Sequence, residues 1–163
     1  MSIQIRKGTT SDLQAAFELI KALAEYEKAP EQVSNSPEKM LKEFQEQAFD
    51  FFVAEKEGRI IGLALYFFSY STWKGRSMYL DDLIVSEEFR RYGIGEKLLH
   101  AVISEAQKLQ VPRLHWQVLD WNEPAIRFYQ KAGAEFDSEW INCRIQENEL
   151  RNYHIGNNSA VWS

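Results

Sequence analysis

The chain has 163 residues, of which 45% are hydrophobic and 13% aromatic, a composition typical of folded rather than disordered protein. Its formal net charge of −5 argues against a general nucleic-acid binder, which needs a basic surface. An acidic chain suits a site that attracts cationic amines.

The length predicts a single domain, residues 1–163, with allowance for a flexible tail over 147–163. No apolar run reaches the length of a membrane span, and Met1 to Arg6 enter a strand pattern rather than a signal peptide. The single cysteine, Cys143, cannot form an intramolecular disulfide, which suggests a reducing compartment. We therefore expect a cytoplasmic protein with no membrane partner.

The first third of the chain predicts one strand and two helices. Ile3 to Arg6 alternate between apolar and polar residues, as in a short strand. Thr10 or Ser11 can cap a helix, because an apolar stripe at helical spacing follows. The stripe consists of Leu13, Phe17, Ile20, Leu23 and Ala24. Ser36 and Pro37 predict the N-cap and first position of a second helix.

The middle of the chain predicts a hairpin, a further strand and a long helix. Phe51 to Glu57 and Arg59 to Tyr70 read as antiparallel strands with a turn at Gly58. An apolar run over 78–85 predicts the next strand, and Glu96 to Leu109 carry an uninterrupted helical pattern.

The last third predicts two strands around one short helix. Arg113 to Val118 read as a strand, and Asn122 can cap a helix that ends near Gly133. Trp140 to Gln146 predict a last strand, and the tail from Glu147 is polar. This order of elements predicts an α+β fold in which helices flank a central, mostly antiparallel sheet.

A turn with two glycines, Arg90-Arg91-Tyr92-Gly93-Ile94-Gly95, separates the strand over 78–85 from the long helix. Free backbone N–H groups at a helix start, with no Cβ on the glycines, can surround a pyrophosphate. The helix dipole adds about half a positive charge there. A plain strand-to-helix turn is the alternative interpretation.

Two other phosphate loops are excluded by the residues after this turn. Glu96 and Lys97 follow Gly95 in place of the Lys-Ser/Thr of a P-loop, and position 98 is Leu where a dinucleotide fingerprint needs Gly or Ala. The remaining pattern, Arg-x-x-Gly-x-Gly, resembles the acetyl-coenzyme A (acetyl-CoA) loop of the GCN5-related N-acetyltransferase (GNAT) superfamily. The resemblance implies a splayed strand pair at the acetyl-CoA site.

A second motif, Asn122 to Ala134, resembles the late superfamily motif Asn-x-x-Ala-x-x-Phe-Tyr-x-x-x-Gly-Ala. Phe128 and Tyr129 share a helix face, so both could be core residues, and for Phe128 we keep that interpretation. A phenol can carry a proton, and the resemblance places Tyr129 at the general-acid position.

Further motifs narrow the resemblance to the diamine (spermidine/spermine) N-acetyltransferase family and, within it, to thialysine Nε-acetyltransferases. These motifs are Leu23 to Glu27, Glu31 to Val33, Tyr70 to Arg76, Tyr79 to Asp82, and Trp121 with Asn122. The resemblance covers about residues 3 to 137. It implies acetyl transfer from acetyl-CoA to the primary amine of a small cationic acceptor, by direct attack in a ternary complex. It also implies a homodimer with the last strand at the subunit boundary.

The resemblance also implies the site residues. Tyr129 is the expected acid and Asp81 the expected base, and a backbone N–H of Leu83 or Ile84 stabilises the charge that develops on the thioester oxygen. The expected contacts to acetyl-CoA are Leu83, Ile84, Val85, Arg91, Tyr92, Gly93, Ile94, Gly95, Glu96, Asn122, Glu123, Pro124 and Ala125. The expected acceptor-binding residues are Tyr26, Glu27, Ser71, Trp73 and Asp81.

The reaction needs a group that takes a proton, because an alkylammonium has a pKa near ~10.4. On a regular strand Asp81 and Asp82 point to opposite faces, so only one of them can face the acceptor. Asp81 stands where the family has a Glu, and its shorter side chain favours a bridging water. A solvated strand end or bulge is the alternative interpretation of the pair.

Two departures from the family pattern bear on binding. Ala132 replaces a basic residue that contacts the cofactor in diamine enzymes, although Lys131 is adjacent. Ser71 stands where polyamine-acetylating members carry an acidic residue. We therefore expect long polyamines to be poorer substrates than lysine-like amines such as thialysine.

We expect no metal, because His100, His115 and His154 lack ligand spacing. Trp162 in the tail either contacts a partner subunit or is an exposed end. A non-catalytic acyl-CoA sensor or interaction module on the same fold is the alternative to an enzyme. The joint presence of Glu27, Asp81 and Tyr129 favours the enzyme.

Overall fold

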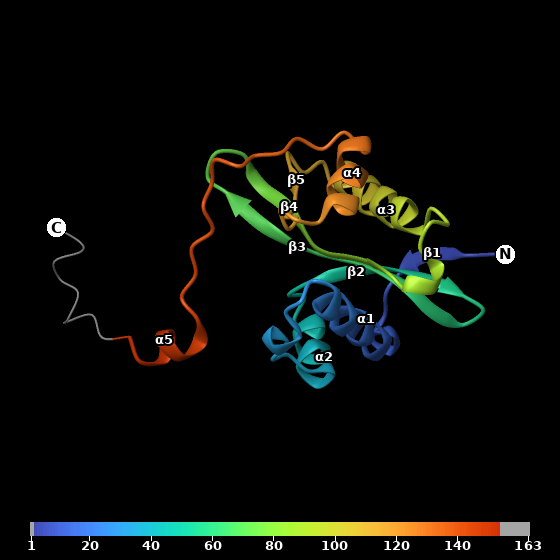
Figure 1. Cartoon of the computed structure of the whole chain (residues 1–163), viewed down its shortest axis with the longest axis horizontal. Coiled ribbons are helices and arrows are strands. Elements are labelled where there is room, and N and C mark those ends of the chain that lie inside the picture. Colours follow the sequence, from blue (N-terminus) through green and yellow to red (C-terminus); the bar gives the residue numbers. More distant parts are fainter. Residues whose placement is uncertain (1, 154–163) are drawn as a thin grey trace. The chain divides into compact units, whose positions relative to one another are not determined.

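The computed structural model describes residues 2–153, which belong to two compact units. The first unit ends at Gln117 and the second begins at Val118. A five-stranded sheet with helices on both faces makes up the first unit, and the described part of the second contains helices α4 and α5 (Figure 1).

The sheet has the strand order β1-β2-β3-β4-β5. Its strands are β1 (Gln4–Lys7), β2 (Asp50–Lys56), β3 (Arg59–Ser71), β4 (Gly75–Val85) and β5 (Leu114–His115). Neighbouring strands pair antiparallel except for β4 with β5, which pair parallel. The predicted α+β fold with a mostly antiparallel sheet is confirmed.

Strand β5 is shorter than the predicted strand Arg113–Val118. Its ladder with β4 joins Met78 to Leu114 and Tyr79 to His115. Because β4 continues to Val85, the two strands part beyond Tyr79, which gives the splayed pair that the resemblance implies. A strand needs ladder partners for its backbone groups, so β5 ends where it leaves β4.

The predicted hairpin of β2 and β3 is confirmed, including its turn. Glu57 and Gly58 have positive φ angles of 51° and 78°. Two successive left-handed residues are typical of the type I′ turn, whose twist matches the twist of the flanking strands.

The helices of the first unit are α1 (Leu13–Tyr26), α2 (Pro37–Gln45) and α3 (Ile94–Lys108), with 3₁₀ turns η1 (Thr10–Asp12), η2 (Pro30–Gln32) and η3 (Glu87–Phe89). Ser36 caps α2 as predicted, because its Oγ accepts a hydrogen bond from Lys39 N at 3.2 Å. The cap predicted for α1 was wrong: Thr10 and Ser11 lie in η1, and Asp12 is the N-cap of α1. The Asp12 carboxylate accepts from Thr9 N at 2.8 Å and thereby stabilises the extra turn.

Helices α1 and α2 cover one face of the sheet and α3 covers the other (Figure 1). Side chains of a strand point alternately to the two faces of the sheet. On one face, Leu63 and Leu65 of β3 pack with buried residues of α1 and α2. On the opposite face, a Cβ on Gly62 would lie 2.9 Å from Cδ1 of Leu98 in α3. A larger residue at position 62 would therefore push α3 away from β3.

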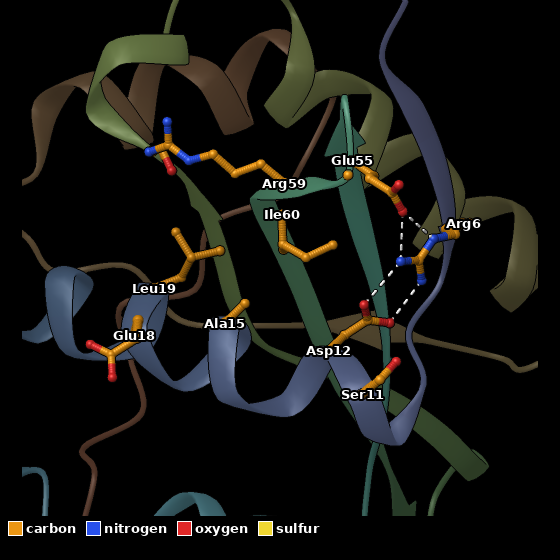
Figure 2. Close-up of a pocket in the computed structure, with 11 residues that line it drawn as sticks. Arg6, Ser11, Asp12, Ala15, Glu18, Leu19, Glu55, Arg59 and Ile60 are labelled. Atoms are coloured by element: carbon orange, nitrogen blue, oxygen red, sulfur yellow. Dashed lines mark hydrogen bonds and ion pairs between the residues drawn. The ribbon is translucent and has the colours of Figure 1, made fainter.

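An ion cluster around Arg6 joins β1 to β2 and to the start of α1 (Figure 2). Arg6 Nη1 lies 2.7 Å from Asp12 Oδ2, and Arg6 Nε donates to Glu55 Oε2 at 2.8 Å. The hydrogen bonds from Arg6 lower the pKa of the Asp12 carboxyl to about 2. The cluster therefore stabilises the fold above the carboxyl's unfolded pKa of about 3.9, and this stabilisation is lost as pH falls towards 2.

The second unit contains α4 (Glu123–Lys131) and the short α5 (Glu147–Arg151). Asn122 caps α4 as predicted, with its Oδ1 accepting from Ala125 N at 3.4 Å. Gly133 follows α4 with a φ of 86°, the left-handed conformation that the sequence predicts after a helix. The sequence did not predict α5, which carries an ion pair between Glu147 and Arg151.

The predicted strand over Trp140–Gln146 was wrong, because these residues form no regular structure. Alternating apolar residues suggested the strand, but no other strand lies within the described part of this unit to pair with it. Trp140 and Ile141 are consequently 75% and 86% exposed. His154 and Trp162 lie outside the described residues.

Candidate active site

The ladder between β3 and β4 contains a bulge at Asp81. Leu65 pairs with Asp82, and the next residue of β3, Tyr66, pairs with Leu80. Asp81 is therefore an extra residue with no partner opposite it on β3. Bulges bend a strand and re-aim its side chains, so the simple alternation expected for Asp81 and Asp82 does not hold here.

Three carboxylates from two elements come together at this bulge: Glu27, Asp81 and Asp82, which we call the carboxylate cluster. Glu27 directly follows α1 as its C-cap residue. Burial and then the charge of Asp81 raise the pKa of Glu27. Burial, Asp81 and Glu27, in that order, raise the pKa of Asp82 to about 7. The charges of Asp81 and Glu27 therefore both act on Asp82, and the three carboxylates share one electrostatic environment.

The members of the carboxylate cluster differ in exposure. Asp81 is exposed, whereas Asp82 and Glu27 are partly buried. Although the residue is exposed, the surrounding protein keeps water from part of the Asp81 carboxyl and so raises its pKa. An exposed carboxylate can meet a cation from solvent, and the deeper Asp82 can hold a proton near neutral pH. The sequence analysis named Asp81 alone as the expected base; the raised pKa of Asp82 depends on burial and on the neighbouring carboxylates Asp81 and Glu27.

Next to the carboxylate cluster, three rings lie in line across the sheet: Phe67 of β3, Tyr79 of β4 and His115 of β5. We call these rings the aromatic row. Ring centroids lie 5.1 Å apart for Phe67 and Tyr79 and 4.9 Å apart for Tyr79 and His115. Burial, then Asp81 and Asp82, raise the pKa of Tyr79, so the row and the cluster share one environment.

His115 also contacts a polar side chain, that of Ser69 on β3. Its Nε2 lies 3.0 Å from Oγ of Ser69 on β3. Burial and the nearby charge of Arg113 lower the pKa of the imidazole, which keeps the ring neutral at physiological pH. The sequence analysis considered His115 only as a metal ligand and missed its contact with Tyr79.

Not all of the expected acceptor-binding residues lie near the cluster. Tyr26 ends α1 next to Glu27, and the guanidinium of Arg90 lies 5.2 Å from its ring centroid. Ser71 ends β3 and pairs with Gly75, which lies six residues before Asp81, or roughly 20 Å along a strand, and Trp73 lies in the turn between them. Ser71 Oγ accepts from Trp73 N and Lys74 N at 3.3 and 3.2 Å, and Trp73 is 87% exposed.

The turn from Arg90 to Gly95 leads from η3 into α3. Arg91 and Gly93 both have a φ of 72°, and Gly93 is the N-cap of α3 with no side chain to cap it. The N–H groups of the first turn, including those of Gly95 and Glu96, therefore have no partner within the helix. Alternating left-handed residues at such a helix start make a nest for an anion.

Strand β4 and this turn position the remaining residues of the first unit that are expected to contact acetyl-CoA. Leu83, Ile84 and Val85 end β4 and pair with Ala64, Leu63 and Gly62. Ile94 is buried and anchors α3 in the core, whereas Tyr92 is 63% exposed. Arg90 Nε donates to Val85 O at 3.2 Å and so ties the turn back to the end of β4.

The other expected site residues belong to α4 of the second unit. Glu123, Pro124 and Ala125 form its first turn, behind the Asn122 cap. Tyr129 lies one turn further on, and its ring is 5.3 Å from that of Phe128 in an edge-on contact.

Two further features of the described chain are separate from this site. A pocket at the start of α1, lined by Arg6, Asp12, Glu18 and Arg59 among others, contains no expected site residue (Figure 2). Within residues 2–153, no three His, Cys, Asp or Glu side chains are arranged to hold a metal ion. No helix in that range has both the length and the apolar surface to cross a membrane.

Comparisons with known proteins find acetyltransferases. The family model described as "Acetyltransferase (GNAT) family" matches residues 15–134. Thialysine N-epsilon-acetyltransferase of Bos taurus is 38% identical over 162 residues, covering 91% of this chain and 95% of that protein. L-ornithine N5-acetyltransferase of Arabidopsis thaliana is 39% identical over 93 residues, covering 56% of this chain and 41% of that protein.

The solved structures show the same fold. An aminoglycoside acetyltransferase from an uncultured soil metagenomic sample, in complex with trehalose, matches with a TM-score of 0.76 and 21% identity. The match covers 88% of this chain and 97% of that one.

Asp82 gives a testable link between this site and stability. The folded chain keeps a proton on Asp82 up to about pH 7, whereas an unfolded chain releases it near pH 3.9. Between these values the folded state binds more protons, so the free energy of unfolding falls as pH rises. Asp82→Asn cannot ionise, so its stability relative to the native chain should be greater at pH 8 than at pH 5, by up to about 3 kcal/mol.

Urea unfolding of both proteins at pH 5 and pH 8 measures this difference. Glu31→Gln, which removes an exposed carboxylate on η2, is the matched control. A difference between Asp82→Asn and native protein that does not change with pH would contradict the raised pKa.

Proposed function

The chain belongs to the acetyltransferase (GNAT) family and is an N-acetyltransferase, and we propose that it moves an acetyl group from acetyl-CoA to the primary amine of a small cationic acceptor. In this proposal the amine attacks directly in a ternary complex. The carboxylate cluster at the β4 bulge is the observation that carries it, because three acidic groups in one place attract an ammonium ion.

The acceptor in this proposal is a lysine-like amine. One relative is named for thialysine and another for L-ornithine, and both of these acceptors combine an amino-acid end with a distal primary amine. Ser71 supports a preference against long polyamines, because its hydroxyl cannot pair with a second cationic centre. A lost charge-assisted contact typically costs ~1.5–3 kcal/mol.

Asp81 and Asp82 take the proton that the ammonium must lose. Asp81, being exposed, contacts the ammonium directly or through a water, and Asp82 titrates near neutral pH. A base whose pKa lies near the working pH is the most effective one. Removal of this proton leaves a lone pair on the amine nitrogen for attack.

The turn from Arg91 to Glu96 holds the cofactor in this proposal. Left-handed Gly93 and the uncapped first turn of α3 fit a pyrophosphate, since they present N–H groups and no Cβ. Leu83, Ile84 and Val85 and the first turn of α4 would contact the rest of the molecule. When bound, acetyl-CoA supplies the activated acetyl group, and the Tyr129 phenol would supply a proton to the departing sulfur.

A non-catalytic acyl-CoA sensor on this fold would need the cradle but not the proton-carrying groups. The carboxylate cluster favours the enzyme, because buried like charges destabilise a fold and persist where they serve a function. The absence of a metal and a cytoplasmic location stay predictions of this proposal.

Turnover with a panel of amines tests the proposal most simply. We expect free thiol release from acetyl-CoA with thialysine and, more slowly, with spermidine. Tyr129→Phe keeps the ring and deletes the hydroxyl, so turnover should fall at least about tenfold while the affinity for acetyl-CoA stays the same. Acetyl-CoA binding by calorimetry without turnover of any amine would instead indicate the sensor.

We also propose a homodimer in which the segment over 140–146 packs at the subunit boundary. Trp140, Ile141, Ile145 and Leu150 are 55–86% exposed, and exposed apolar side chains in one segment mark an interaction surface. Light scattering at micromolar concentration should give a dimer, and Trp140→Ser with Ile141→Ser should shift it towards monomer. A native protein that is monomeric under these conditions would overturn the proposal.

A further inference from the structure

Arg113 immediately precedes β5 and carries an unusual side chain. Its Nε is buried and has no hydrogen-bond partner among the described residues. An N–H group that is buried without a partner is costly, and a carboxylate is the acceptor that best matches the planar fork of a guanidinium. The residue as a whole is partly exposed.

Arg113 lies beside the aromatic row, next to β5. Met78 N donates to Arg113 O at 2.9 Å, so the ladder of β4 with β5 extends to this residue. Arg113 precedes His115 by two positions, which places both on the same side of the strand. The charge of Arg113 acts on His115, the last ring of the aromatic row.

Opposite charges therefore lie on the two sides of the aromatic row, as seen along the strands. The carboxylate cluster lies beyond Tyr79 on β4, and Arg113 lies before His115 on β5. Ser69 Oγ and the imidazole of His115 add neutral hydrogen-bonding groups on this face. This arrangement complements a molecule with an ammonium at one end and an amino-acid group at the other.

The spacing also fits such a molecule. Because Met78 pairs with Leu114, Arg113 lies beside Ser77, four residues before Asp81 and roughly 13 Å away along the strand. An extended lysine-like amino acid measures roughly 9 Å from its distal nitrogen to its carboxylate oxygen, across seven bonds. Hydrogen bonds of about 2.8 Å at each end bring the span to roughly 15 Å, which is comparable with the separation of these two strand positions.

We propose that Arg113 binds the α-carboxylate of an amino-acid acceptor and so selects amino acids over simple diamines. The inference rests on the proposed N-acetyltransferase function and adds a specificity-determining residue to it. Ser69 Oγ, held by His115, would accept a hydrogen bond from the α-ammonium, while the distal ammonium meets the carboxylate cluster.

The test compares two acceptors that differ only in the carboxylate: thialysine and bis(2-aminoethyl) sulfide, its decarboxylated counterpart. The native protein should prefer thialysine in kcat/KM. Arg113→Gln should lower kcat/KM for thialysine about ten- to a hundredfold, mainly through KM, and leave the diamine within about twofold. Arg113→Lys keeps the charge without the planar fork, so its kcat/KM for thialysine should lie between the values of the native protein and Arg113→Gln.

Lys42→Gln, which removes an exposed positive charge on α2, controls for net charge and should change neither acceptor. An unchanged affinity for acetyl-CoA, measured by calorimetry, establishes that Arg113→Gln is folded. An equal fall for both acceptors, or no fall for thialysine, overturns the role of Arg113 while the acetyltransferase proposal stands. No turnover of either acceptor by the native protein overturns both.

Discussion

The bulge at Asp81 is the constraint on which the rest of the site depends. A regular ladder would send Asp81 and Asp82 to opposite faces, and Asp82 alone would stand near Glu27. With one extra residue in β4, both aspartates and Glu27 influence one another. Burying like charges opposes folding, and the core around Leu63, Leu65 and Ile84, together with the ion cluster at Arg6, offsets this cost.

Two regions around β4 carry different groups of the proposed site. The face that α1 covers carries the carboxylate cluster and the aromatic row, which suit the acceptor. The end of β4 and the start of α3 carry the uncapped N–H groups, which suit a pyrophosphate. In the proposed function, β4 would therefore set the distance between the amine and the acetyl group. Arg90 ties the turn before α3 to Val85 and to the ring of Tyr26.

Features that depend on a few neighbouring residues could be predicted from the sequence. The turn at Gly58, the Ser36 and Asn122 caps and the Arg90–Gly95 turn all follow from side chains within four positions. Features that depend on distant pairing could not. The bulge needs the register of β3, the contact of His115 with Tyr79 needs the β4–β5 ladder, and the strand expected over Trp140–Gln146 lacks a neighbour to complete it.

The central claim, that the carboxylate cluster removes the proton of the acceptor, is tested most directly by the pH dependence of kcat/KM for thialysine between pH 5 and 9. For the native protein the account predicts a rise that levels off above about pH 7, where Asp82 is ionised. In Asp82→Asn the rise near pH 7 should vanish and the plateau should fall by about a hundredfold or more. A profile for Asp82→Asn with the same midpoint and plateau as the native protein would contradict the account.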